Sequence, residues 1–154
     1  MTFLRVTSDV ESDPQKIFAS FWDMARLQAF WNPVSHVEVF YDDGDHQEAS
    51  MSVQRNGQEE NIRIIRFRVG SDIVFFNPVP PPMMRYHRGA WRIAPHPQGG
   101  CTVSAEREYE LIRDMTDSDE EHAARVEAFD LGLASRLQSL LESLARATAG
   151  ERTA

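Results

Sequence analysis

The sequence predicts a single α+β domain, in which an antiparallel sheet of about seven strands lies against one long C-terminal helix. Three observations support this fold class. Six alternating segments separated by turn residues lie between positions 35 and 112, a helical pattern occupies 12–31, and a longer helical pattern occupies 118–150. A strongly curved sheet and a single helix cannot always fill the space between them with side chains, so this arrangement can enclose a cavity.

The N-terminal part predicts one strand followed by two short helices. Residues 3–11 read as the strand. Ser12 or Asp13 is suited to the N-cap of the first helix, and Pro14 is suited to its first position. Apolar residues then recur at helical spacing. We expect the helix to break near 23–25, and an Asn-Pro pair to end the second helix.

The central part predicts six further strands, each ended by a turn signal. Asp43-Gly44 and Asn56-Gly57 are two such signals, and Asn-Gly is the stronger indication of a hairpin. Gly70-Ser71, a run of prolines at 80–82 and a glycine pair at 99–100 separate the later segments. The predicted strands occupy 35–42, 47–55, 60–70, 72–78, 84–94 and 101–112.

The C-terminal part predicts the longest regular element, a helix over 118–150. Ser118 followed by Glu121 is a capping box. Gly150 is a plausible C-terminal stop. One face carries an apolar stripe at helical spacing. Its members are Val126, Phe129, Leu133, Leu137, Leu140 and Leu144.

Length, composition and charge limit the classes of function. The chain has 154 residues, 42% of them hydrophobic and 26% charged, which predicts one domain over 1–150 and a tail over 151–154. The net charge of −8 argues against nucleic-acid binding, which needs a basic surface. No apolar run approaches the roughly 18 residues of a membrane span, and no signal-peptide core is present. A single cysteine, Cys101, favours a reducing compartment, so we expect a cytoplasmic protein.

Metal and phosphate sites are not predicted. The five histidines show no paired ligand spacing, and Cys101 has no second cysteine nearby in the sequence. The sequence also has no glycine-rich phosphate loop and no nucleophile elbow. We therefore expect a protein without a metal or another cofactor.

Three stretches of the sequence carry a resemblance to a known superfamily. They are "VESDPQKIFASFWDM", "FWNPVSHVEVF" and "RGAWRIAPHPQGGCTVSAEREYEL", followed by the C-terminal helix. Together they resemble the START-like helix-grip superfamily, also called SRPBCC, over residues 3–148. Within it, the chain looks most like the polyketide aromatase/cyclases. The resemblance implies a curved sheet wrapped around the long helix, with an internal cavity.

The strand over 60–70 carries arginines on both faces. Side chains alternate along a strand, so Arg66 and Arg68 share one face with two isoleucines, and Arg63 lies on the other. The strand alone favours Arg66 and Arg68 in solvent, because unpaired arginines are rarely buried. The resemblance favours the cavity, because the fourth strand of aromatase/cyclases carries an inward arginine that corresponds to Arg68. Both orientations stay open at this point.

Further candidates come from neighbouring elements. His87 is a candidate general acid or base, and Asp130 is a candidate base or partner of a cavity arginine. The alternatives are a histidine hydrogen-bonded at the sheet edge and a carboxylate that faces water. Arg107 and Tyr109 share one face of the last strand, where cavity, core and surface are all open. The predicted substrate-binding residues are Trp31, Ile64, Met83, Tyr86, Trp91, Tyr109 and Phe129.

The resemblance implies a cyclase or aromatase that folds a poly-β-carbonyl chain in an apolar cavity. It would promote intramolecular aldol cyclisation and dehydration, with Arg68 and Arg66 holding the enolate oxygen. The alternative is a non-catalytic carrier for a lipid or another hydrophobic molecule. The substrate could arrive on an acyl carrier protein docked at Arg85 and Arg88. The proline-rich loop over 77–87 would form a lip at the cavity mouth, and a homodimer is left open.

Overall fold

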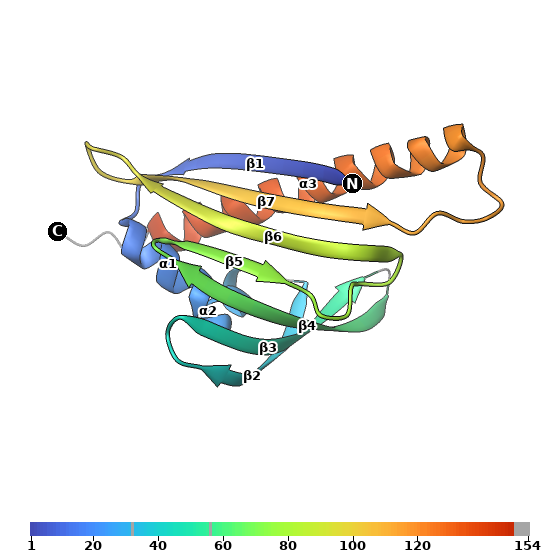
Figure 1. Cartoon of the computed structure of the whole chain (residues 1–154). Coiled ribbons are helices and arrows are strands. Elements are labelled where there is room, and N and C mark those ends of the chain that lie inside the picture. The colour runs from blue at the N-terminus through green and yellow to red at the C-terminus, as the bar shows by residue number, and fades with distance from the viewer. Residues whose placement is uncertain (32, 56, 150–154) are drawn as a thin grey trace.

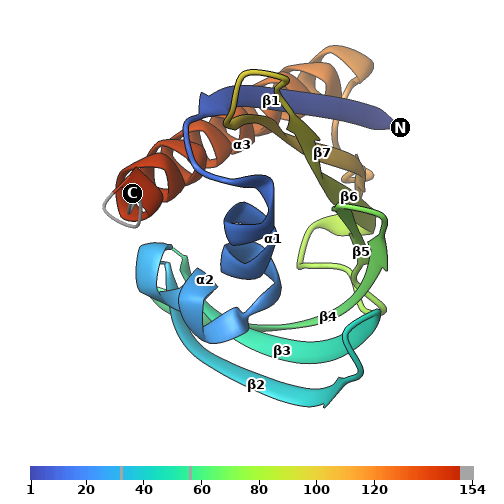
Figure 2. The same ribbon diagram turned by 90° about the vertical axis from the view of Figure 1, so that its left-hand side faces the viewer.

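The computed structural model of the chain describes residues 1–31, 33–55 and 57–149. In it, an open antiparallel sheet curls around two short helices and one long helix (Figures 1 and 2), which confirms the predicted fold class. The seven strands lie in the order β1-β7-β6-β5-β4-β3-β2, so that β1 and β2 form the two edges. The strands are β1 (Thr2–Val10), β2 (Val34–Asp42), β3 (His46–Arg55), β4 (Gln58–Val69), β5 (Asp72–Phe76), β6 (Met84–Pro95) and β7 (Cys101–Leu111).

The two short helices are α1 (Pro14–Trp22) and α2 (Met24–Phe30). Asp13 is the cap of α1, because its Oδ1 accepts a hydrogen bond of 2.7 Å from the backbone N–H of Gln15. Asp23 separates the helices where the break was predicted. Its Oδ1 accepts a bond of 3.0 Å from the N–H of Ala25, which caps α2. Of the predicted boundary signals, Asn32, Asn56 and Gly150 lie outside the described residues.

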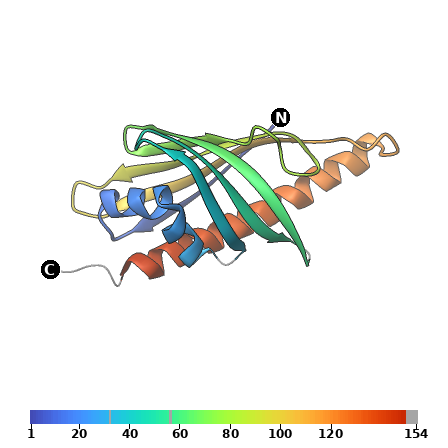
Figure 3. The same cartoon turned by 90° about the horizontal axis from the view of Figure 1, so that it is seen from below.

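The long helix α3 (Asp119–Ala149) runs beneath β1 and β7 (Figure 3). Ser118 caps it, since its Oγ accepts a hydrogen bond of 3.1 Å from the N–H of Glu121. The leucines of the predicted stripe are buried from Leu137 onward, together with Leu141. They belong to the main core, in which the ring of Phe21 from α1 stacks on Trp91 from β6 at 4.2 Å between centroids.

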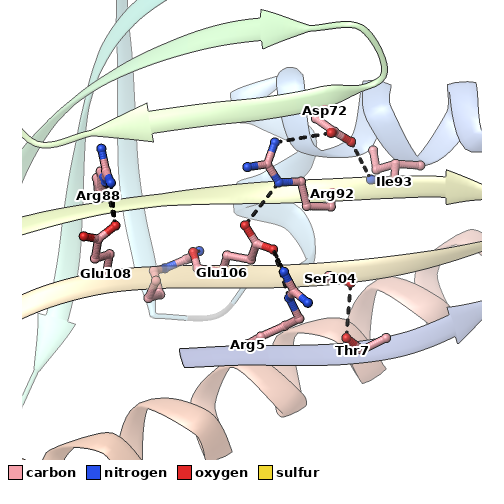
Figure 4. Close-up of polar contacts among 10 residues, drawn as sticks. Arg5, Thr7, Asp72, Arg88, Arg92, Ile93, Ser104, Glu106 and Glu108 are labelled. Carbon is pink, nitrogen blue, oxygen red and sulfur yellow. Dashed lines mark hydrogen bonds and ion pairs between the residues drawn. The ribbon is translucent and has the colours of Figure 1, made fainter. Parts of the chain in front are cut away.

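The outer face of the sheet is polar where β1, β7, β6 and β5 meet (Figure 4). Glu106 lies at its centre and accepts hydrogen bonds from Arg5 at 2.9 Å and from Arg92 at 3.1 Å. Arg92 also reaches Asp72 at 3.4 Å. Burial by itself raises the pKa of Glu106, but the bonds from the two arginines outweigh it, so that the net pKa is lowered.

No helix in the described part of the chain combines the length and the apolar character that crossing a membrane requires.

Candidate functional site

A small cavity of about 90 Å³ lies between the concave face of the sheet, α2 and α3. Its wall is mostly apolar, with polar groups from Arg66, Asn77, His87, Arg107 and Arg136. The apolar lining residues are Met24, Leu27, Trp31, Met51, Val53, Ile62, Ile64, Phe75, Pro81, Met84, Trp91, Phe129, Leu133 and Leu137. Such a wall with a few polar groups is typical of a small-molecule site.

A larger groove of about 670 Å³ adjoins the cavity. The two spaces share Trp31, Val53, Phe129 and Arg136 as lining residues. The groove alone has the size that is usual for a ligand pocket, roughly 300–1,000 Å³. The cavity alone has room for on the order of six water molecules. A ligand of ordinary size therefore exceeds the cavity alone, whereas the groove has room for it.

Arg66 faces inward, but its hydrogen bonds hold the fold together. Its side chain is 1% exposed and donates to the backbone oxygens of Phe21 at 2.7 Å and Trp22 at 2.6 Å. It also donates to Gln47 Oε1 at 2.8 Å. Burial lowers the pKa of Arg66 to about 9, and the charge of Asp42 acts in the opposite direction. The guanidinium thus binds the C-terminal carbonyls of α1, the negative end of that helix dipole.

The expectation that Arg68 lines the cavity is wrong. Its side chain is exposed, Nε donates to the carbonyl oxygen of Gly70 at 3.1 Å, and the guanidinium lies 4.4 Å from the ring centroid of Phe18. Arg68 shares the inward face of β4 with Arg66, but it lies near the C-terminal end of the strand, beyond the cavity. There its guanidinium contacts Phe18 of α1.

Arg107 of β7 takes the place that was expected for Arg68. It lines the cavity, is 5% exposed, and its guanidinium lies 4.7 Å from the ring centroid of Phe75 and 4.6 Å from that of Trp91. Within the described part of the chain, one hydrogen bond holds its side chain, from Nη1 to the carbonyl oxygen of Glu106 at 2.7 Å. No carboxylate among the described residues forms an ion pair with it, and burial lowers its pKa to about 9.

Gly89 creates the space in which Arg107 lies. Across the sheet, Phe75, Gly89 and Arg107 are paired in one row of β5, β6 and β7. A Cβ added to Gly89 would lie 2.7 Å from Phe75 Cζ and 3.0 Å from Arg107 Cδ. The missing side chain therefore lets an aromatic ring and a guanidinium meet above the backbone of β6.

His87 and Asn77 form the second polar feature of the cavity. His87 Nδ1 is hydrogen-bonded to Asn77 Oδ1, and both residues line the cavity. The ring of Phe75 lies 6.0 Å from the imidazole, at a tilted angle. His87 is thus hydrogen-bonded, as one alternative expected, but β6 is an interior strand and not the sheet edge, and His87 also lines the cavity.

Asp130 is paired with a tyrosine rather than with an arginine. Tyr109 donates from its hydroxyl to Asp130 Oδ1 at 2.7 Å, and burial together with this bond raises the pKa of Tyr109. Tyr109 is fully buried in a second small core cluster, with its ring 5.2 Å from that of Phe129. Neither Tyr109 nor Asp130 lines the cavity or the groove, so the structure brings neither predicted residue to these two spaces.

The remaining predicted binding residues divide between the two spaces. Ile64 and Trp91 line the cavity, while Trp31 and Phe129 line both the cavity and the groove. Met83 lines only the groove, where it has a positive φ of 75° and is exposed. Tyr86 lines neither space, and the guanidinium of Arg88 lies 5.8 Å from its ring.

Two functional candidates were missed or left undecided by the sequence. Arg107 shares its strand face with Val103, Ala105 and Tyr109, which are all buried, and this shared face was a signal that could have placed Arg107 inside. Asn77 had no such signal, because it opens a proline-rich stretch that reads as a loop. Among the described residues, no cluster of histidine, cysteine and carboxylate side chains could hold a metal ion.

Comparisons with known proteins agree with this architecture. The sequence profile of the family described as polyketide cyclase / dehydrase and lipid transport matches residues 10–126. No curated protein matches the sequence. The Zhui aromatase/cyclase from a Streptomyces species is 14% identical, with a TM-score of 0.75 over 99% of both chains.

Two further solved structures show the same fold. A START superfamily protein from Mycobacterium smegmatis is 11% identical, with a TM-score of 0.78 over 97% of this chain and 99% of that one. The di-domain ARO/CYC BexL of the BE-7585A biosynthetic pathway is 21% identical, with a TM-score of 0.79 over 94% of this chain and 49% of its own. At these identities the likeness shows the helix-grip fold and nothing about activity.

Proposed function

We propose that this chain, which belongs to the polyketide cyclase / dehydrase and lipid transport family, binds a poly-β-carbonyl intermediate and promotes its intramolecular aldol cyclisation and dehydration. The observation that carries the proposal is Arg107. A buried guanidinium without a carboxylate partner among the described residues is costly to keep, so it needs a functional reason. Arg107 would stabilise a substrate oxygen that becomes negatively charged during the reaction, and this would be its function.

Arg107 would act on the carbonyl oxygen next to the carbon that loses its proton. The guanidinium donates hydrogen bonds and stays cationic at neutral pH, because its lowered pKa of about 9 still lies well above 7. Its contacts with the rings of Phe75 and Trp91 would hold the guanidinium in place before the substrate arrives. Donors held in place in an apolar site stabilise an enolate more strongly than water does.

His87 would transfer the protons. Its imidazole accepts a proton from the carbon between two carbonyls, and the electron pair moves onto the oxygen held by Arg107. The enolate carbon then bonds to a second carbonyl carbon of the same chain, whose oxygen takes the proton back from the imidazolium. Loss of that hydroxyl with a neighbouring C–H proton releases water and leaves a double bond in the new ring.

A carrier for a lipid or another hydrophobic molecule is the second candidate. The family description includes lipid transport, and apolar side chains make up most of the cavity wall. In that case Arg107 would anchor a ligand oxygen without chemistry. Delivery by an acyl carrier protein stays a prediction. Arg88 is already ion-paired with Glu108 at 2.6 Å, which leaves Arg85, an exposed residue, as the more available docking cation.

A direct comparison of two arginine variants tests the proposal. A synthetic linear poly-β-carbonyl thioester is incubated with wild type, Arg107→Met and Arg68→Met, and the products are separated by chromatography. We expect Arg107→Met to slow formation of the cyclised product roughly a hundredfold, and Arg68→Met to match wild type. Equal rates for all three proteins and for buffer would exclude the cyclase. Binding of the thioester without accelerated cyclisation would support the carrier.

A further inference from the structure

We propose that Asn77 is a positioning residue that holds His87 with its proton on Nδ1 and its lone pair on Nε2. This inference rests on the proposed function, because a proton acceptor in the cavity needs one defined tautomer. It concerns a residue that does not itself have to touch the substrate. The argument comes from the two hydrogen bonds of the Asn77 side chain.

The first bond fixes the orientation of the Asn77 amide. Its Nδ2 donates to the carbonyl oxygen of Arg63 at 2.8 Å. A carbonyl oxygen can only accept, so the nitrogen of the amide must face Arg63. The oxygen of the same amide therefore faces His87, in agreement with its hydrogen bond to Nδ1.

The second bond fixes the tautomer of His87. Because Asn77 Oδ1 can only accept, His87 Nδ1 must donate, and a neutral imidazole carries a single N–H. The lone pair of the neutral ring then lies on Nε2. A neutral amide can set this tautomer, as a carboxylate does elsewhere, without adding a negative charge beside the cationic Arg107 in the same cavity.

The backbone holds the two residues in register. Asn77 is 7% exposed, and its N–H donates to the carbonyl oxygen of His87 at 3.3 Å, which extends the pairing of β5 with β6 by one contact. Pro78 follows directly, and a residue before proline is confined to extended conformations. The first proline of the stretch after β5, Pro78, therefore helps to fix the backbone conformation of Asn77.

The tautomer can be measured without substrate. Two-bond ¹H–¹⁵N correlation spectra at mildly alkaline pH distinguish the two neutral forms of each histidine, and a His87→Gln spectrum assigns the signals. We expect His87 in wild type to carry its proton on Nδ1. Asn77→Leu, similar in volume, should shift it largely to Nε2, whereas Asn77→Asp should keep it on Nδ1 because its carboxylate still accepts. An Nε2 proton in wild type, or an unchanged tautomer in Asn77→Leu, would overturn the assignment.

Steady-state kinetics then distinguish a positioning role of Asn77 from a purely structural one. With the poly-β-carbonyl thioester, Asn77→Leu should lower kcat by roughly a hundredfold, with KM changed by less than about twofold. Asn77→Asp should recover a large part of that loss. A changed tautomer with unchanged kcat would overturn the positioning role while Arg107→Met still tests the proposed function. If no variant and no wild type cyclises the thioester, the proposed function fails, and the spectra still decide the Asn77–His87 pairing.

Discussion

Gly89 of β6 and Arg107 of β7 are paired across the sheet, and the side chain of Arg107 occupies the space that a residue larger than glycine would fill. The same space receives Phe75, whose Cζ would lie 2.7 Å from an added Cβ. The cavity cation and one of its two aromatic neighbours thus depend on a single missing methyl group.

Replacing Gly89 with alanine should destabilise the protein and displace Arg107. The new Cβ would lie 2.4 Å from the backbone oxygen of Glu106, which cannot move away as a side chain can. We expect a loss of about 1–3 kcal/mol in the free energy of unfolding, measured with urea. Gly132→Ala is the matched control, because its Cβ meets only Arg136 Nη1 at 3.5 Å. In a helix this change should stabilise by about 0.5–1 kcal/mol. Equal effects of the two changes would contradict the role of Gly89.

Replacing Arg66 with methionine should cost stability because of the groups that it leaves behind. Phe21 O, Trp22 O and Gln47 Oε1 would each lose a donor in a buried place. We expect a loss of about 3 kcal/mol in denaturant unfolding. Arg68→Met, which removes an exposed guanidinium from the same strand, should change stability by less than about 0.5 kcal/mol. Similar losses in both variants would mean that Arg66 does not hold α1.

Replacing Arg107 with methionine should stabilise the protein, in contrast to the replacement of Arg66. A buried cation without an ion-pair partner among the described residues is removed, so we expect a gain of about 1–3 kcal/mol at neutral pH, together with loss of function. The folded-state pKa of Arg107 is about 9 and the ordinary value is 12.5. The unfolded chain therefore binds more protons between these values, and wild type recovers stability as pH rises through about 9.

The predicted rise in wild-type stability with pH can be measured directly. Urea unfolding of wild type and Arg107→Met is compared at neutral pH and at about pH 10, and the advantage of the variant should shrink at the higher pH. An advantage that stays constant would show that the guanidinium does not titrate in this range. A destabilised variant at neutral pH would show that Arg107 serves packing instead of binding.

Glu106 should contribute stability that is lost in acid. Its pKa in the folded protein is below the ordinary 4.5, so its contribution is present above that value and disappears as pH falls through the lowered pKa. Arg5 is exposed and Arg92 is partly exposed, which limits the effect to about 1 kcal/mol. We expect wild type to lose more stability than Glu106→Gln on acidification. Equal losses in the two proteins would contradict this role of Glu106.

The sequence predicted the order of helices and strands along the chain, because alternation and turn residues are local signals, whereas the strand over 60–70 by itself left the inward face of β4 open. It could not predict which inward arginine reaches the cavity. Arg66 and Arg68 meet α1 on the concave face, whereas Arg107 lies between Phe75 and Trp91 beside Gly89. These surroundings depend on contacts between segments far apart in the chain. Asn77 was missed for a related reason, since its partners Arg63 and His87 lie on two other strands.

The narrow cavity beside the wide groove has one more consequence. Arg107 and His87 line the space of about 90 Å³, whereas neither lines the groove of about 670 Å³, which shares Trp31 and Phe129 with the cavity. Under the proposed function, a long substrate that lies in the groove would present only its leading atoms to the polar groups of the cavity, Arg107 and His87 among them. The position of ring closure would then be set by its distance from one end of the substrate, whatever the total length.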